Sequence, residues 1–289
     1  MKQFLLAITF LAGNATIITV TQEKKARCLG ESKQLIESEA GKRAFEDQLE
    51  GKPQHKIGKG LSSAISLDEL SGLVFKKPYQ QMSKDTKTEC LGLMMQRWPG
   101  RPELYIGVGH LRDTTLGYFE NPAQIFITLF KISKPHTFEI VSQTAKPFLF
   151  TIQNPAHIDG FDLEYALDEL LGIDGAPFKI APNEYAFGLR LACNKGYAGG
   201  FAQFQNLILF CLKDKTITPI LNIPIYSLEN YAGDWNEDGT RERFVTEREW
   251  VVCITEKKHN EHFNLQIKQK KTNKSYQLTW NSGKYTLAK

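Results

Sequence analysis

Alternation of apolar and polar residues places the strongest constraint on the fold, because the pattern recurs along the chain from residue 103 onward. It is clearest at 263–268 and at 276–280, on either side of a Lys-rich turn. Successive side chains of a β-strand point to opposite faces of its sheet, so each of these segments would have one apolar and one polar face. The pair is therefore predicted to form the outer hairpin of an antiparallel sheet, with one face wet.

The rest of the C-terminal two thirds has the same character. Short apolar or alternating runs predict strands at 104–111, 125–132, 138–141, 186–192, 207–212, 217–221 and 250–255. We therefore predict a mainly β fold, built as an antiparallel sandwich or as two packed β units. This β region would span 101–289 and follow a helical N-terminal segment.

Part of the β region has a pattern that fits an internal duplication, with repeats near 101–180 and 181–260. Shifts of 80 and 79 residues align identical residues: Tyr105 with Tyr185, Leu111 with Leu191, Leu129 with Leu209, Phe130 with Phe210, Thr137 with Thr216, and Asp159-Gly160 with Asp238-Gly239. Any two β hairpins share such a pattern, however. A duplication and two unrelated hairpins therefore both remain open.

The segment 16–100 is predicted to be helix and loop. Apolar residues recur at helical spacing in 31–49, and a Gly-Lys-Pro sequence at 51–53 ends that pattern. Ser66 and Glu69 have the spacing of a capping box, in which each residue satisfies a backbone amide of the other. A second, short helical turn is therefore expected from there to Phe75.

The first 15 residues are predicted to be a signal peptide. Lys2 precedes an apolar run at 4–13, and small residues around Ala15 suit cleavage before Thr16. An uncleaved anchor reaching Val20 is the alternative, although its polar residues make it a short one. The mature protein would be periplasmic or secreted, and not an integral membrane protein.

Charge and cysteine content agree with this compartment. The net charge of +4 is too small to predict nucleic acid as a main partner. The five cysteines include no Cys-x-x-Cys pair, which argues against a zinc ribbon. In an oxidising compartment Cys28 and Cys90 would be the leading disulfide candidates, whereas Cys193 and Cys211 should not pair. Buried free thiols are the alternative for all five.

The most specific local motif is Gly233-Asp-Trp-Asn-Glu-Asp-Gly-Thr-Arg-Glu242. Oxygen-bearing groups recur along it at Asp234, Asn236, Asp238, Thr240 (through its carbonyl) and Glu242. Ca²⁺ binds about six to eight oxygen ligands that converge from such a turn. These five residues are therefore the predicted metal ligands, with calcium as the cofactor.

The motif differs from an EF-hand because Val245 stands where that loop has a bidentate Glu, and no flanking helices are evident. Its spacing resembles the β-type calcium loops of FG-GAP repeats, in which an acidic residue closes the site and a strand follows. The alternative is a polar Asp-Gly turn held by hydrogen bonds from side chains to the backbone.

The region around this motif also resembles known proteins over a stretch longer than the motif itself. Residues 183–190, 196–200 and 232–241 are similar to segments of uncharacterised exported bacterial proteins that share a GDWNxDGTR-like sequence. The resemblance covers about 180–280. It implies export and carries no activity.

Other candidate residues are weaker, and none is assigned a catalytic or cofactor-binding role. His259 and His262 flank a charged turn and are read as solvated. His110 with Asp113, and His157 with Asp159 and Asp162, are read as structural or as parts of a polar face. Sequence signatures of common hydrolases, zinc proteases and nucleotide-binding loops are absent.

These observations favour an exported, non-enzymatic binding or structural protein of the bacterial envelope, stabilised by calcium and recognising an unidentified protein or envelope ligand. One alternative is a periplasmic inhibitor of a lysozyme-like hydrolase, because Ser282-Gly-Lys-Tyr285 is one residue shorter than the S-G-x-x-Y stretch of such inhibitors. A cell-wall hydrolase using His110 or His157 is the other.

Overall fold

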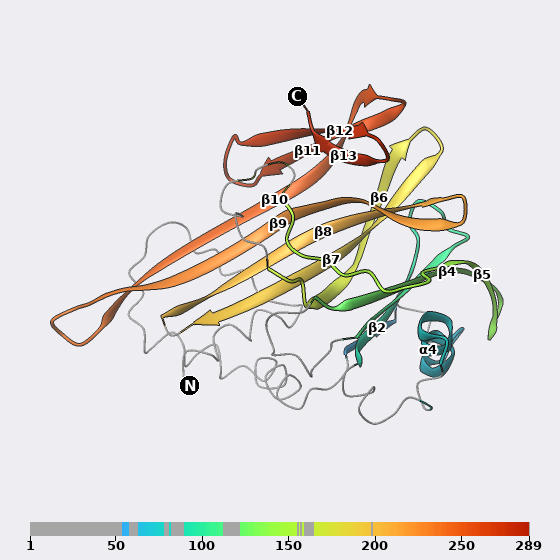
Figure 1. The fold of residues 1–289 in the computed structure, drawn as a ribbon, viewed down its shortest axis with the longest axis horizontal. Helices are drawn as coiled ribbons and strands as arrows, with labels where there is room; N and C mark the ends of the chain where they lie inside the picture. Colours follow the sequence, from blue (N-terminus) through green and yellow to red (C-terminus); the bar gives the residue numbers. More distant parts are fainter. Residues whose placement is uncertain are drawn as a thin grey trace. The chain divides into compact units, whose positions relative to one another are not determined.

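The computed structural model describes residues 54–57, 63–77, 81, 90–111, 122–154, 156, 158, 165–197 and 199–288 (Figure 1). Several predictions of the sequence fall outside these residues: the signal peptide, the helix at 31–49, Cys28, and the candidates Asp113, His157, Asp159 and Asp162. Within the described residues the protein is mainly β, as predicted. No described helix is long and apolar enough to cross a membrane.

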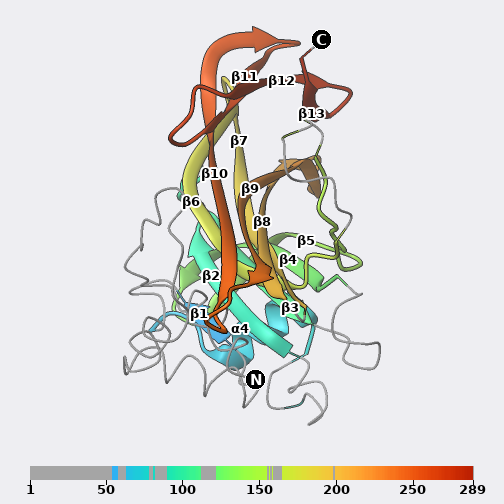
Figure 2. The ribbon, with the colours of Figure 1, turned by 90° about the vertical axis from the view of Figure 1, so that its left-hand side faces the viewer.

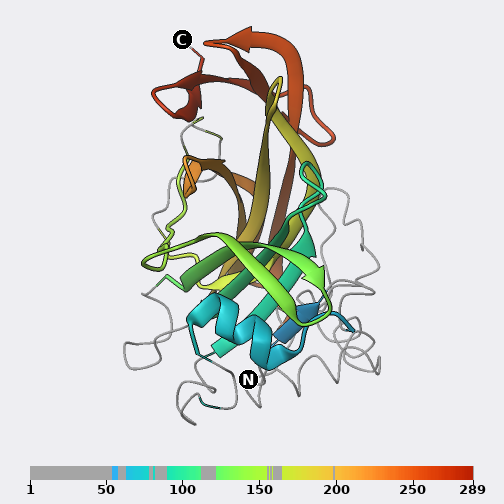
Figure 3. The ribbon, with the colours of Figure 1, turned by 90° about the vertical axis from the view of Figure 1, so that its right-hand side faces the viewer.

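One sheet has five strands in chain order, shown in Figure 3 with the helix beside them. They are β1 (Gln54–Ile57), β2 (Cys90–Arg97), β3 (Tyr105–Leu111), β4 (Gln124–Lys134) and β5 (Thr137–Gln143). β1 pairs with β2 in parallel, whereas the pairs from β2 to β5 are antiparallel. The sequence predicted β3, β4 and β5. It did not identify β1 or β2, which lie inside the segment assigned to helix and loop.

Helix α4 (Leu67–Phe75) packs against this sheet. The contact is close because β3 has glycine at two alternate positions that face the helix. A Cβ atom at Gly109 would lie 2.3 Å from the Phe75 ring, and one at Gly107 would lie 3.2 Å from Leu70 and Val74. The apolar side of the helix therefore fills the space that larger side chains on β3 would occupy. Leu70 and Val74 are both buried in the resulting core.

The other sheet has eight strands, and each strand neighbours the next one in the chain (Figure 2). They are β6 (Glu169–Ala181), β7 (Glu184–Tyr197), β8 (Gly200–Lys213), β9 (Thr216–Trp235), β10 (Arg241–His259), β11 (His262–Gln269), β12 (Ser275–Asn281) and β13 (Lys284–Leu287). These strands include every remaining strand that the sequence predicted. β9 and β10 extend well beyond the apolar runs at 217–221 and 250–255 that identified them.

The chain forms two compact units. The described part of the smaller unit consists of 194–197, 199–204 and 227–248, which include the end of the β9–β10 hairpin. The larger unit contains the five-stranded sheet, α4 and the rest of the eight-stranded sheet. Among the described residues, Cys193, Cys211 and Cys253 are free.

Aromatic side chains form the core of the larger unit. Trp98, which directly follows β2, is fully buried and meets Phe187 of β7 edge-on at 5.1 Å between ring centroids. Its indole nitrogen donates a hydrogen bond to the Ala186 carbonyl at 3.3 Å. Phe187 stacks in turn on Phe210, which also contacts Phe148. This cluster joins the end of β2 to β7 and β8.

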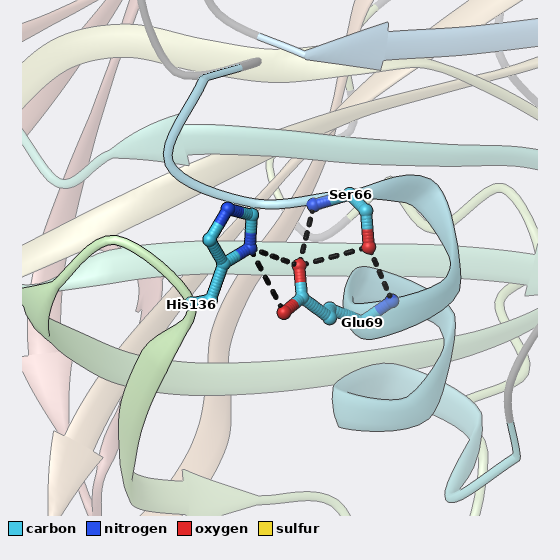
Figure 4. A network of polar contacts seen from close by, with 3 residues as sticks. All are labelled: Ser66, Glu69 and His136. Carbon is cyan, nitrogen blue, oxygen red and sulfur yellow. Dashed lines mark hydrogen bonds and ion pairs between the residues drawn. The ribbon is translucent and has the colours of Figure 1, made fainter.

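The predicted capping box is present at the start of α4 and includes a third residue (Figure 4). A carboxylate oxygen of Glu69 accepts hydrogen bonds from the Ser66 amide at 2.7 Å and its hydroxyl at 2.8 Å. Nδ1 of His136, in the β4–β5 turn, lies 2.9 and 3.0 Å from the two Glu69 oxygens. Burial raises the pKa of Glu69, but the hydrogen bonds from Ser66 and His136 outweigh it and lower the pKa overall.

Replacing Glu69 should therefore weaken the fold in a pH-dependent way. A lowered pKa means that folding favours the carboxylate, so its contribution is present at neutral pH and is lost as the pH falls through that pKa. Glu69→Gln keeps an acceptor for the capping box and removes the charge. We expect it to cost up to about 1 kcal/mol at pH 7, and the cost should shrink below about pH 4. Thermal unfolding of both proteins across pH measures this, and a cost that did not change with pH would contradict it.

Candidate functional site

The end of the β9–β10 hairpin, at the left of Figure 1, contains the motif that the sequence singled out. The chain reverses between Trp235 and Arg241. The Asn236 amide donates to the Thr240 carbonyl at 2.7 Å, and the Gly239 amide donates to the Asn236 carbonyl at 3.0 Å. Gly239 has a φ of +75°, a backbone conformation that residues with a Cβ atom adopt at a cost. The Asp-Gly pair thus serves as a tight hairpin turn.

Side chains reinforce this turn. Oδ1 of Asp238 accepts hydrogen bonds from the Thr240 hydroxyl at 2.6 Å and from its backbone amide at 3.0 Å. The Asn236 side-chain amide donates to the same hydroxyl at 2.9 Å. The hydrogen bonds from the Thr240 hydroxyl and amide hold the pKa of Asp238 below its ordinary value. The turn therefore favours an ionised carboxylate at its centre.

The structure brings together three of the five predicted calcium ligands, namely Asn236, Asp238 and Thr240. The other two lie on the strands. Glu242 lies beside Gly233, because a Cβ atom built at Gly233 would be 2.9 Å from the Glu242 Cβ. Asp234 directly follows Gly233 in β9. The hydrogen-bonded cluster at the turn thus consists of the central three of the five predicted ligands.

An exposed aromatic surface lies next to the turn. Tyr231 and Trp235 of β9 and Phe244 of β10 are all exposed near this end of the hairpin. The Phe244 ring lies over Gly233, 2.6 Å from where a Cβ atom would be. Phe244 thus occupies the position of the side chain that Gly233 lacks. The exposed fractions are 70% for Trp235, 57% for Phe244 and 43% for Tyr231. We call these three residues the aromatic surface.

Arginine side chains hold the strands that carry the aromatic surface. The Arg241 guanidinium donates to the Gly233 carbonyl at 2.8 Å and lies over the Trp235 ring, 5.3 Å from its centroid. Arg243 donates to the Gly199 carbonyl at 3.0 Å, which also accepts from the Ala232 amide at 2.7 Å. These contacts restrain the end of the hairpin although its rings are exposed.

The hairpin is acidic overall. Residues 227–248 contain six carboxylates and three arginines, which gives a net charge of −3, whereas the whole chain carries +4. Arg248 makes an ion pair with Glu229 at 2.8 Å, on the same face as Tyr231. Arg241 and Arg243 are held by backbone carbonyls. The charge that the hairpin presents to a partner is therefore negative.

The histidines that the sequence offered as weaker candidates make contacts within the fold. His259 and His262 pair across a tight turn between β10 and β11. The prediction that both are solvated is wrong for His262, whose side chain is only 15% exposed because it stacks on Trp280. Nδ1 of His259 lies 3.0 Å from the Trp280 carbonyl. The His262 ring stacks on Trp280 at 3.9 Å, and its Nε2 lies 3.4 Å from a Glu184 oxygen. His110 is buried within β3, between β2 and β4.

The stretch that suggested a hydrolase inhibitor forms the β12–β13 turn. Ser282 and Gly283 have φ values of +47° and +88°, which suit a tight hairpin. The Tyr285 side chain is buried, and its hydroxyl donates to the Phe263 carbonyl at 2.8 Å. Burial, together with the charge of Glu184, raises the pKa of Tyr285 above its ordinary value. Tyr285 therefore contributes to the core and presents no group to a partner.

Sequence reasoning recognised the turn but missed the aromatic surface. Trp235 and Phe244 were treated as residues within and after a calcium loop. The sequence does contain a signal for the aromatic surface, namely Gly233 on one strand and the aromatic residue Phe244 on the next. Aromatic rings commonly cover a glycine of the neighbouring strand in a sheet. Within the described part of the chain, no three His, Cys, Asp or Glu side chains are grouped so that they could hold a metal ion. Comparisons of the chain with protein families, with characterised proteins and with solved structures found no match.

Proposed function

We propose that this chain is an exported, non-enzymatic binding protein of the bacterial envelope, and that the end of the β9–β10 hairpin is its binding element. The exposure of Tyr231, Trp235 and Phe244 at one restrained end of the hairpin is the observation that carries the proposal. Clustered apolar side chains on a surface commonly mark sites of protein–protein interaction. Aromatic residues and arginine also dominate the binding energy of protein interfaces.

The restraint of the hairpin supports binding in a second way. Association costs conformational entropy for every loop and side chain that becomes ordered. Hydrogen bonds within the turn, and from Arg241 and Arg243 to the backbone, order this end of the hairpin before any partner arrives. The cost of binding is therefore lower than for a mobile loop of the same composition.

Export is part of the proposal, and the N-terminal sequence supports it. Lys2, the apolar run at 4–13 and the small residues around Ala15 have the organisation of a signal peptide. The mature protein would then be periplasmic or secreted. Its partner would be a protein or another envelope component.

Calcium binding at the turn is a further part of the proposal. The cluster of Asn236, Asp238 and Thr240 supports it, because three oxygen-bearing side chains lie close together there. The low pKa of Asp238 keeps a carboxylate available. In this proposal the Asp238 carboxylate exchanges its hydrogen bonds from Thr240 for the ion, which requires several oxygen ligands.

We also infer that the larger unit is organised as packed β layers that arose by duplication. Two antiparallel series support this inference: β3 to β5, and β7 to β9. The aligned identities occupy corresponding strands, since Leu129 and Phe130 are in β4 and Leu209 and Phe210 are in β8. The contacts of Trp98 with β7 support packing between the layers.

Site-specific photo-crosslinking in the producing cell tests the binding element. A photoreactive phenylalanine analogue placed at Trp235 should give a discrete cross-linked product in the envelope fraction, which mass spectrometry then identifies. The same analogue at Ile140, an exposed position on β5 with 50% exposure, is the control. We expect no matching product from Ile140. Equal products from both positions, or none from Trp235, would contradict the proposed function.

A further inference from the structure

The aromatic surface and the charge of the hairpin together define the kind of partner. We propose that the end of the β9–β10 hairpin docks onto a basic, lysine- and arginine-rich protein surface, with Trp235 as the central anchor. This inference rests on the proposed function and names the partner class for the same site. It follows from the geometry of the aromatic surface, from the state of the hairpin arginines and from the sign of the net charge.

The aromatic rings provide the apolar contact. Trp235 is the most exposed of the three rings, and the Phe244 ring lies over Gly233, two residues before Trp235 in β9. Aromatic faces attract lysine and arginine side chains as well as apolar groups. Arg241 already occupies one side of the Trp235 ring, which shows that the ring accepts a guanidinium group. A second cation, from a partner, can use the exposed ring area.

The negative charge of the hairpin indicates which class of partner it can bind. The net charge of −3 on residues 227–248 opposes docking onto nucleic acid or an anionic lipid surface, both of which repel carboxylates. Glu237 and Asp234 are exposed at and near the turn. Both lie within two residues of Trp235 in the chain, and charges act over about 8 Å at physiological salt. A basic protein surface complements both the rings and the carboxylates.

The chain itself offers one competing partner. Because the whole chain carries +4, the residues outside the hairpin segment carry +7. A second copy of this chain could therefore present a basic surface to the hairpin. The oligomeric state at high concentration must for this reason be measured alongside binding.

Calorimetry of binding to basic test proteins tests the inference. The whole protein is titrated with egg-white lysozyme or cytochrome c, which are both basic, and with ovalbumin as an acidic control. Each titration is made at low and at high salt. Trp235→Ala removes the anchor, and Glu237→Lys reverses one exposed charge of the hairpin. Glu256→Lys makes the same change of net charge on an exposed part of β10 outside the smaller unit. Circular dichroism confirms that each variant is folded.

We expect saturable binding to the basic proteins that weakens with salt, and no binding to ovalbumin. Trp235→Ala should weaken it by at least about tenfold, and Glu237→Lys by about threefold to tenfold. Glu256→Lys should change it by less than about twofold. Equal losses from Glu237→Lys and Glu256→Lys would overturn the inference, because they would indicate attraction by overall charge.

Three other results would also overturn the inference. These are no binding to either basic protein, dimerisation that depends on Trp235, and binding of the protein to vesicles of anionic lipid. A discrete cross-link from Trp235 to a neutral or acidic partner would overturn this inference and leave the proposed function standing. The absence of any cross-link from Trp235 would instead contradict the proposed function.

Discussion

Trp98→Ala should lower the free energy of unfolding of the larger unit by about 3–5 kcal/mol, the usual cost of removing a buried Trp side chain. The side chain is fully buried, packs edge-on against Phe187 and donates a hydrogen bond to the Ala186 carbonyl. The substitution leaves a cavity between the end of β2 and β7, and it leaves that carbonyl without the indole donor. Both effects act on the place where the two sheets make contact.

Equilibrium unfolding in urea, followed by far-ultraviolet circular dichroism, measures this cost. Trp98→Phe keeps most of the volume and should cost less than the alanine variant. Ile140→Ala is the control, because this side chain is exposed and its removal should change stability by less than about 0.5 kcal/mol. A loss below about 1 kcal/mol in Trp98→Ala would show that the contact between β2 and β7 contributes little to the fold.

Calcium should raise the melting temperature if the β9–β10 turn binds the ion. A ligand that binds only the folded state stabilises it by about 2.7 kcal/mol when its concentration is a hundred times Kd. Asp238 supplies the carboxylate at the centre of the turn. We therefore expect Asp238→Ala to abolish the rise. Differential scanning calorimetry with and without calcium gives the comparison.

A matched control separates the turn from the general effect of charge. Glu256→Ala removes an exposed carboxylate outside the turn and should leave the calcium response intact. The calcium-free protein should lose little stability in Asp238→Ala, since the carboxylate is exposed and the hydrogen bonds it makes are local. No calcium response in the unaltered protein would show that this segment is a hydrogen-bonded Asp-Gly turn.

Local sequence determines the turn of the β9–β10 hairpin, but not the contacts of the strands beside it. The Asp-Gly pair, with Asn236 and Thr240 around it, determined a tight turn because these side chains bond to the nearby backbone. Local sequence could not show that Glu242 lies beside Gly233, since that depends on how β9 pairs with β10. For the same reason the aromatic surface was not predicted. It requires the Phe244 ring to meet Gly233 of the neighbouring strand.

Nine strands and the cap of α4 were predicted from the sequence, because alternation and the Ser66–Glu69 spacing act within a few residues. Strands β1, β2, β6 and β13 were missed. In the case of β2, a short apolar run does not distinguish a buried strand from a helix. Tertiary structure decided the strand order, the parallel pairing of β1 with β2, and the close approach of α4 to Gly109. It also placed His136 beside Glu69 and Trp98 beside Phe187. Each of these contacts joins segments distant in the chain, so its energy depends on packing that only the complete fold provides.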